Sequence, residues 1–191
     1  GAGLSYRHYV ALLEELAAVE GGIALSVAAH NSLGTNHILL FGTEEQKRRW
    51  LPRLAGGEML AAWGLTEPEA GSDSGATRTV AKRRDGSWVL EGTKAFITHS
   101  RVGGVAVVMA RTSPGSDHRG ISAFIVPLDA PGVSAGRAED KVGMRVSDTA
   151  SLVLEECVLG ADALLGGEGE GFHQAMEVLD GGRISIAALG G

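Results

Sequence analysis

The sequence contains a single cysteine, Cys157, among 191 residues, which excludes an internal disulfide framework and favours a reducing compartment. No apolar run reaches the roughly 18–20 residues that cross a bilayer, and no basic-then-apolar signal segment opens the chain. Positive charge is also scarce: the formal net charge is −6, so no global field attracts nucleic acid or a membrane surface. We therefore expect neither as a partner, and any phosphate-bearing ligand must be held by local groups.

Aromatic residues make up only 5% of the chain, whereas glycine occurs 29 times, so the hydrophobic cores must rely on Ala, Val and Leu. The hydrophobic content of 44% and the charged content of 21% are those of a soluble globular protein. This length suits one large domain, or one domain with an appendage. Cys157 is expected to be a small buried hydrophobe rather than a nucleophile.

Residues 1–57 carry helical patterns. Ser5 to Glu20 places its apolar residues on one face, and Ile23 to Ala29 is apolar almost all round, as in a helix buried on several sides. Thr43 and Gln46 have the spacing of a capping box, which predicts the start of a further helix. We expect this region to be part of a helical domain.

After Gly57 the pattern changes to short β-type segments, with a hairpin signal at Asp85-Gly86. Many short strands without intervening helices predict a closed or two-layered antiparallel β domain over 58–160. The segments are Thr77–Arg83, Trp88–Glu91, Lys94–Thr98, Val105–Ala110, Ile121–Val126, Ser134–Arg137 and Thr149–Glu155. A glycine-rich link and a helix from Phe172 to Leu189 occupy 161–191, so the fold class is α+β.

The stretch from Trp63 to Asp73 carries the strongest chemical signal. An apolar run leads into this stretch, as at the end of a buried strand. Pro68 and Gly71 then interrupt regular strand pairing. A strand that ends in a polar, glycine-containing loop lets backbone N–H groups approach an anionic or polar ligand closely. An ordinary strand-to-loop exit would leave the same pattern, and the residues alone do not separate the two.

This stretch, Trp-Gly-Leu-Thr-Glu-Pro-Glu-Ala-Gly-Ser-Asp, resembles the flavin-binding signature of the acyl-CoA dehydrogenase family. The resemblance runs over nearly the whole chain. It implies the family's order of N-terminal helices, a middle β-barrel or sandwich domain, and a C-terminal four-helix bundle. It also implies that the 191 residues stop after the first helix of that bundle.

The resemblance implies FAD as the cofactor. Lys94 to Thr98 resembles the family strand that passes the isoalloxazine ring, with Phe96 where many relatives have Trp. Glu67 and Asp73 are expected to shape the loop rather than to do chemistry. The implied cofactor-binding residues are Trp63, Leu65, Thr66, Gly71, Ser72, Phe96, Ile97 and Thr98.

Ser72, Asp180 and Arg183 are implied to contact acyl-CoA. Asp180 and Arg183 are three apart and share a helix face, so an exposed ion pair of little energetic weight is the alternative for them. The glycines between them, Gly181 and Gly182, would let a substrate approach the helix closely.

Two further features are a second family-like segment and the spacing of the histidines. The segment from Lys141 to Leu152 also resembles the family, and there we assign Arg145 and Asp148 structural roles. The six histidines lack zinc-like spacing, so no metal is expected.

The family chemistry needs a carboxylate that removes the α-proton of the acyl thioester. In isovaleryl- and long-chain-type relatives it precedes the arginine that matches Arg183, but Gly182 holds that place here. In the other relatives the base lies late in the bundle. We therefore expect no catalytic residue in this chain, a base beyond Gly191, and a short-chain, butyryl-type relative.

The sequence-based hypothesis is FAD-dependent α,β-dehydrogenation of an acyl-CoA, to which 1–191 alone would contribute little activity. The alternatives are an acyl-CoA oxidase or flavin monooxygenase of the same fold, and a non-catalytic acyl-CoA- or flavin-binding module. The implied partners are acyl-CoA, electron-transfer flavoprotein and further copies of the chain, as a homotetramer or homodimer. The expected location is the cytoplasm, or the mitochondrial matrix in a eukaryote.

Overall fold

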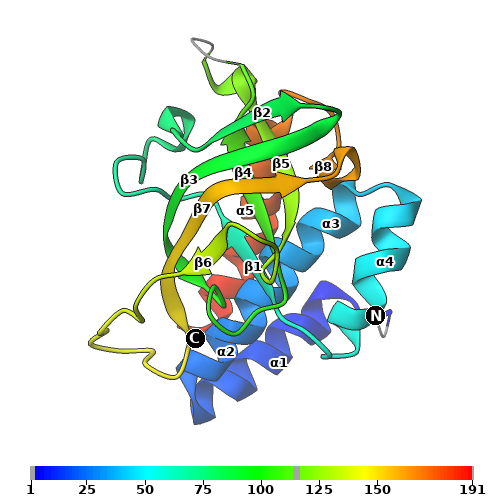
Figure 1. The fold of residues 1–191 in the computed structure, drawn as a ribbon. Coiled ribbons are helices and arrows are strands. Elements are labelled where there is room, and N and C mark those ends of the chain that lie inside the picture. The colour runs from blue at the N-terminus through cyan, green and yellow to red at the C-terminus, as the bar shows by residue number, and fades with distance from the viewer. Residues whose placement is uncertain (1–2, 114–116, 191) are drawn as a thin grey trace.

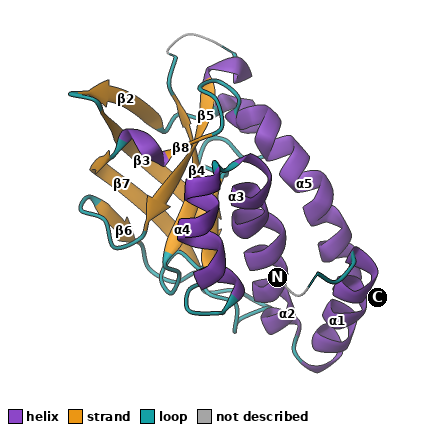
Figure 2. Cartoon of the chain, turned by 90° about the vertical axis from the view of Figure 1, so that its right-hand side faces the viewer, coloured by secondary structure: helices purple, strands orange, loops and turns teal. Residues whose placement is uncertain are grey.

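The structure is a computed structural model that describes residues 3–113 and 117–190. Its helices lie on one side of the molecule and its sheet on the other (Figures 1 and 2). The helices are α1 (Tyr6–Val19), α2 (Gly21–Ala29), α3 (Asn36–Phe41), α4 (Glu44–Ala55) and α5 (Gly171–Ala188). A π-helical turn, His30–Thr35, joins α2 to α3 without a break. Within the described ranges, no helix is both long enough and apolar enough to cross a membrane.

Local sequence accounts for the helix boundaries. The helix expected over 5–20 forms as α1, one residue shorter at each end. The capping box at the start of α4 is present: Gln46 N donates to Thr43 Oγ1 at 3.2 Å, and Thr43 N donates to Gln46 Oε1 at 2.8 Å. Pro52 lies inside α4 without ending it.

The strands form one eight-stranded sheet in the order β6-β7-β3-β2-β4-β5-β8, with β1 beside β4. Its ends are not joined within the described residues, so the closed alternative is not realised. The pairs β1–β4 and β2–β4 are parallel and the other pairs antiparallel. The strands are β1 (Ala61–Gly64), β2 (Val80–Arg84), β3 (Ser87–Thr98), β4 (Val105–Arg111), β5 (Ile121–Pro127), β6 (Val133–Ala135), β7 (Thr149–Leu159) and β8 (Leu164–Leu165).

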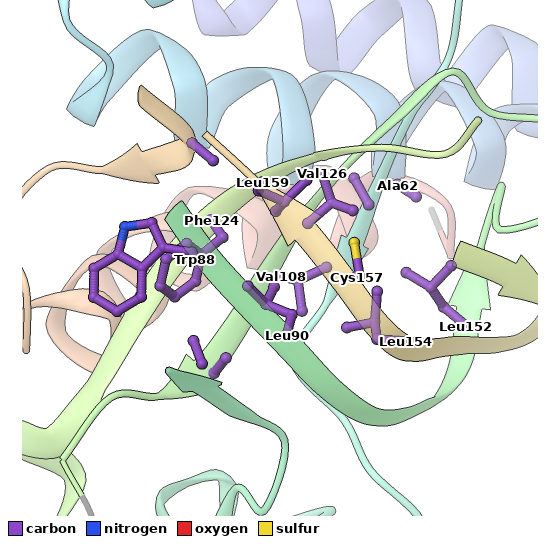
Figure 3. Close-up of a cluster of buried hydrophobic side chains, with 14 of the residues drawn as sticks. Ala62, Trp88, Leu90, Val108, Phe124, Val126, Leu152, Leu154, Cys157 and Leu159 are labelled. Atoms are coloured by element: carbon purple, nitrogen blue, oxygen red, sulfur yellow. The ribbon is translucent and has the colours of Figure 1, made fainter. Parts of the chain in front are cut away.

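Two cores lie on opposite faces of β4 and β5. Between these strands and β3–β7, the sheet folds over a cluster that includes Trp88, Phe124 and Cys157 (Figure 3). Cys157 is buried there, as expected, and burial raises the pKa of its thiol. On the other face, residues such as Met109 and Ile125 pack against the helices. The strands β1, β4 and β5 therefore form a middle layer between the two cores.

Candidate functional site

A cavity of about 210 Å³ lies where β1 and β3 end beneath the helical layer. It gathers residues from two segments some thirty positions apart, together with the helix that precedes them. Its lining comprises Ala29, Leu33, Ala61, Trp63, Leu65, Thr66, Phe96, Ile97 and Thr98.

Most of the predicted cofactor residues meet at this cavity, but not all. Gly71 and Ser72 lie farther along the loop, are exposed, and do not line it. Conversely, Ala29, Leu33 and Ala61 line the cavity although they were not predicted. For Ala29, the signal that could have found it is the helix expected over 23–29, which is apolar almost all round and must therefore face more than one buried surface.

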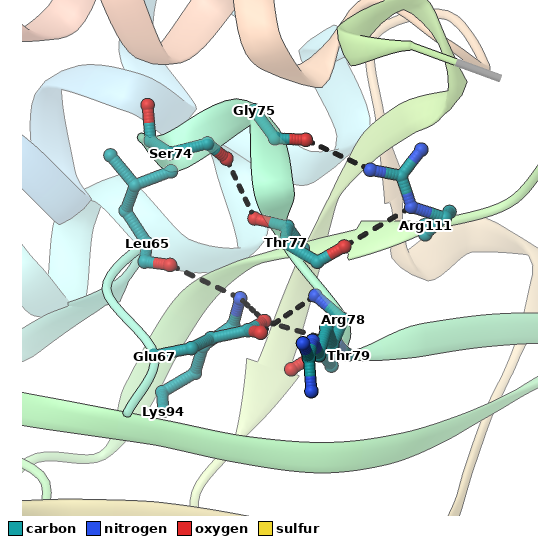
Figure 4. A network of polar contacts seen from close by, with 9 residues as sticks. All are labelled: Leu65, Glu67, Ser74, Gly75, Thr77, Arg78, Thr79, Lys94 and Arg111. Carbon is teal, nitrogen blue, oxygen red and sulfur yellow. Dashed lines mark hydrogen bonds and ion pairs between the residues drawn. The ribbon is translucent and has the colours of Figure 1, made fainter. Parts of the chain in front are cut away.

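The cavity has two walls, the first formed by Trp63–Thr66 and the second by Phe96–Thr98. A buried ion pair holds the first wall in place (Figure 4). Lys94 Nζ donates to Glu67 Oε1 at 2.6 Å and to the Leu65 carbonyl at 3.2 Å. Both charged side chains are almost fully buried, with 0% and 3% of their surface exposed. Glu67 also accepts from the backbone N–H groups of Arg78 at 2.6 Å and Thr79 at 3.0 Å. Glu67 therefore joins the loop after β1, the segment before β2 and strand β3, which is the loop-shaping role expected for it.

The electrostatics of this pair follow from its burial. Burial lowers the pKa of Lys94 to about 8, although the Glu67 carboxylate opposes the shift. Burial alone would raise the pKa of Glu67, but the Lys94 charge and the hydrogen bonds outweigh it and lower that pKa. Each side chain thus needs the other to remain charged in the interior.

The second wall contains a strained aromatic residue. Phe96 has a positive φ of 57°, and 65% of its surface is exposed. It lies where the register of β3 against β7 shifts between Lys94 and Ile97. A left-handed backbone is unusual for a bulky residue, and such strain is found preferentially at functional sites. At this irregularity in the strand, Phe96 lines the cavity.

Two histidines fix the position of β1, and hence of the first wall. The N–H of Ala61 donates to His30 Nδ1 at 3.0 Å, and His99 Nδ1 donates to the Ala61 carbonyl at 3.0 Å. Since His30 Nδ1 accepts, its Nε2 carries the proton and donates to the Leu54 carbonyl at 3.2 Å. Burial lowers the pKa of both rings, so both are neutral near pH 7. The described residues contain no group of three His, Cys, Asp or Glu side chains that could hold a metal ion.

The predicted substrate residues of α5 lie apart from this cavity. Asp180 and Arg183 are both exposed, and no ion pair joins them in the described part of the chain. The close neighbours of the two glycines belong to the chain itself. A Cβ on Gly181 would lie 2.9 Å from Tyr6 Oη, and one on Gly182 would lie 3.2 Å from a methyl carbon of Leu33. A Cβ at either position would therefore require a neighbouring side chain of the same chain to shift.

Arg145 and Asp148 have the structural roles expected of them. Arg145 Nη1 contacts Asp140 Oδ1 at 2.8 Å. The N–H of Arg101 donates to Asp148 Oδ2 at 3.0 Å. Both residues stabilise loops.

Comparison with known families agrees with this arrangement. Residues 62–157 match the family model described as acyl-CoA dehydrogenase, middle domain, and residues 1–58 match acyl-CoA dehydrogenase, N-terminal domain. The chain belongs to the acyl-CoA dehydrogenase family. The resemblance seen in the sequence is thus confirmed, and the cavity is formed where the family's two domains adjoin.

Individual members of the acyl-CoA dehydrogenase family are similar over nearly all of this chain. It is 43% identical to the human mitochondrial short-chain specific acyl-CoA dehydrogenase over 98% of its length and 46% of that relative. The structure of butyryl-CoA dehydrogenase from Megasphaera elsdenii aligns with a TM-score of 0.96 at 41% identity, over 98% of this chain and 49% of that one. A glutaryl-CoA dehydrogenase from Mycobacterium smegmatis in complex with FADH2 aligns with a TM-score of 0.90 at 38% identity, over 98% of this chain and 47% of that one. The chain thus spans about half the length of the relatives it matches.

Proposed function

We propose that this chain provides much of the FAD site, and part of the acyl-CoA site, of an enzyme that dehydrogenates short acyl-CoA thioesters. The observation that carries the proposal is the cavity between Trp63–Thr66 and Phe96–Thr98, two segments that resemble the family's flavin-binding signature. The similarity to short-chain and butyryl-CoA dehydrogenases supports the substrate class.

The lining of the cavity suits a flat, largely apolar ring system. Trp63 and Phe96 offer aromatic surfaces, and Ile97 an aliphatic one. The hydroxyls of Thr66 and Thr98 have no hydrogen-bond partner among the described residues, so both are available to the polar edge of a ligand. No charged side chain lines the cavity in the part that the structure describes. The strain at Phe96 also becomes understandable if its exposed ring is there to contact a planar ligand.

The bound flavin would supply the acceptor for the hydride that leaves the β-carbon of the thioester. The part of the chain described here would position the reactants: Trp63 and Phe96 hold the ring, while Ala29 and Leu33 keep water away from it. We propose that Ser72, Asp180 and Arg183, all exposed, bind the acyl-CoA beyond the cavity.

The α-proton requires a base that this cavity does not offer. No carboxylate lines it among the described residues. We therefore propose a base from outside these 191 residues, with electron-transfer flavoprotein as the acceptor and a homo-oligomer as the assembly.

Spectroscopy of the whole natural protein tests the proposal. We expect a flavin absorption band that butyryl-CoA bleaches in the absence of oxygen, and reoxidation by electron-transfer flavoprotein rather than by O₂. Thr98→Val should weaken FAD binding, whereas Thr93→Val, on the same strand but outside the cavity, should not. The proposal fails if the protein binds no flavin or if both variants bind it like the wild type. Rapid O₂ consumption would indicate an oxidase instead.

A further inference from the structure

Trp63 is connected to a buried hydrogen-bond network behind the cavity. Its indole N–H donates to Nδ1 of His37 on α3 at 2.9 Å. His37 is fully buried and is not part of the cavity lining. Its Nε2 lies 3.0 Å from Oε1 of Gln174 on α5, and Gln174 Nε2 donates to the Leu165 carbonyl of β8 at 3.1 Å. The network therefore runs from the helical layer to the cavity wall.

The chemistry of the two ends fixes the direction of every bond. A carbonyl only accepts, so the amide nitrogen of Gln174 faces Leu165 and its oxygen faces His37. His37 Nε2 must then carry a proton and donate. An indole N–H only donates, so His37 Nδ1 must be unprotonated and accept. His37 is thus held as the neutral Nε2–H tautomer, and this state provides the acceptor that Trp63 needs.

The surroundings of His37 favour that neutral state. The ring of Phe41 meets it edge-on, with 5.5 Å between the centroids, and the indole of Trp63 lies 6.3 Å away. Burial lowers the pKa of His37 to about 4, although the hydrogen bond with Gln174 opposes the shift. A protonated ring would turn two N–H donors toward each other at Trp63.

We propose that His37 is a positioning residue that sets the orientation of the Trp63 indole, and thereby the wall against which the cofactor ring lies. The inference rests on the proposed function, because it concerns how that site is shaped. A half-buried indole has several staggered orientations, and leaving its N–H without a partner in the interior is unfavourable. The His37 acceptor therefore selects the one orientation in which the N–H edge points away from the cavity and the ring borders it.

Three single variants of the whole natural protein, and the double variant His37→Leu, Trp63→Phe, test this role. His37→Leu removes the acceptor, whereas His37→Asn keeps a side-chain oxygen that can accept from the indole. Trp63→Phe removes the donor but keeps an aromatic ring. Two quantities are measured: the ultraviolet resonance Raman band that reports indole hydrogen bonding, with Trp63→Phe identifying its Trp63 component, and the dissociation constant for FAD.

We expect His37→Leu to move the Trp63 band toward that of a free indole and to weaken FAD binding about tenfold. His37→Asn should restore both, and His37→Leu should add no further loss of FAD affinity in the Trp63→Phe background. An unmoved band in His37→Leu, or a moved band with unchanged FAD affinity, would overturn the inference while leaving the proposed function intact. If the wild type itself binds no FAD, the proposed function fails and this inference falls with it.

Discussion

Replacing Lys94 with methionine should destabilise the protein far more than the loss of a surface lysine. Met has a similar length and apolar stem, so packing is largely kept while the charge is removed. The Glu67 carboxylate, 3% exposed, would then lie in the interior without its 2.6 Å partner. Breaking a buried ion pair from one side typically costs about 3–5 kcal/mol. The Leu65 carbonyl would lose its donor as well.

Urea unfolding followed by circular dichroism measures this cost. With a slope of about 2 kcal/mol per M, a loss of 3–5 kcal/mol moves the unfolding midpoint by about 2 M. The matched control is Lys82→Met, because Lys82 is an exposed lysine on the neighbouring strand β2. We expect that control to stay within about 0.5 kcal/mol of the wild type.

The double variant Glu67→Gln, Lys94→Met separates loss of the charge pair from loss of packing. The substituted amide side chain can still accept a backbone N–H bond but no longer carries a charge, so we expect the double variant to be more stable than Lys94→Met alone. The pH dependence has a definite sign. Without Lys94, burial should raise the folded-state pKa of Glu67 above its unfolded value, so the deficit of Lys94→Met should shrink as the pH falls. A midpoint close to that of the wild type, or a double variant less stable than Lys94→Met, would refute the reasoning.

Three further predictions concern separate features. Folding lowers the pKa of His37 from 6.5 to about 4, so between these two pH values the unfolded state binds more protons than the folded state. We therefore expect the free energy of unfolding to fall by about 3 kcal/mol as the pH drops from 6.5 to 4. Urea unfolding at each pH should show a smaller loss in His37→Gln. Phe96→Gly should relieve the left-handed backbone strain and stabilise the cofactor-free protein by about 0.5–1 kcal/mol in thermal unfolding, while weakening FAD binding. A loss of stability together with a loss of FAD affinity would contradict this. Thr43→Ala should remove the cap that accepts from Gln46 N and cost about 1 kcal/mol in the same assay, whereas Thr43→Ser should cost less than half of that.

Elements stabilised by neighbours in the sequence were predictable. The capping box of α4 and the helix α1 depend on residues within one or two turns, and both form as expected. The hairpin at Asp85-Gly86 forms for the same reason: both residues have a positive φ, 51° and 79°, as the favoured two-residue turn requires.

Pairings between distant segments were not predictable from local pattern. The apolar run Val105–Ala110 predicts a buried strand, but nothing within it specifies that β1 lies parallel to it on one side and β5 antiparallel on the other. Trp88–Glu91 and Lys94–Thr98 were expected as separate segments and form the single strand β3, because Gly92 and Thr93 between them also pair with β7. The open path of the sheet is likewise a property of long-range pairing.

The two walls of the site differ in how far the sequence could describe them. The motif at Trp63–Thr66 identified the residue types of one wall. The hydrogen-bond acceptor for the Trp63 indole, however, is His37, which was considered from the sequence only as a possible metal ligand. At Phe96, the residue and the backbone disagree: a left-handed φ favours Gly or Asn, and a strand favours a regular β conformation. Neither local preference explains an exposed aromatic ring in that conformation. At a position where the residue type opposes both the backbone conformation and burial, stability is not the reason for the choice of residue. The reason that we propose is contact of the Phe96 side chain with a ligand in the neighbouring cavity.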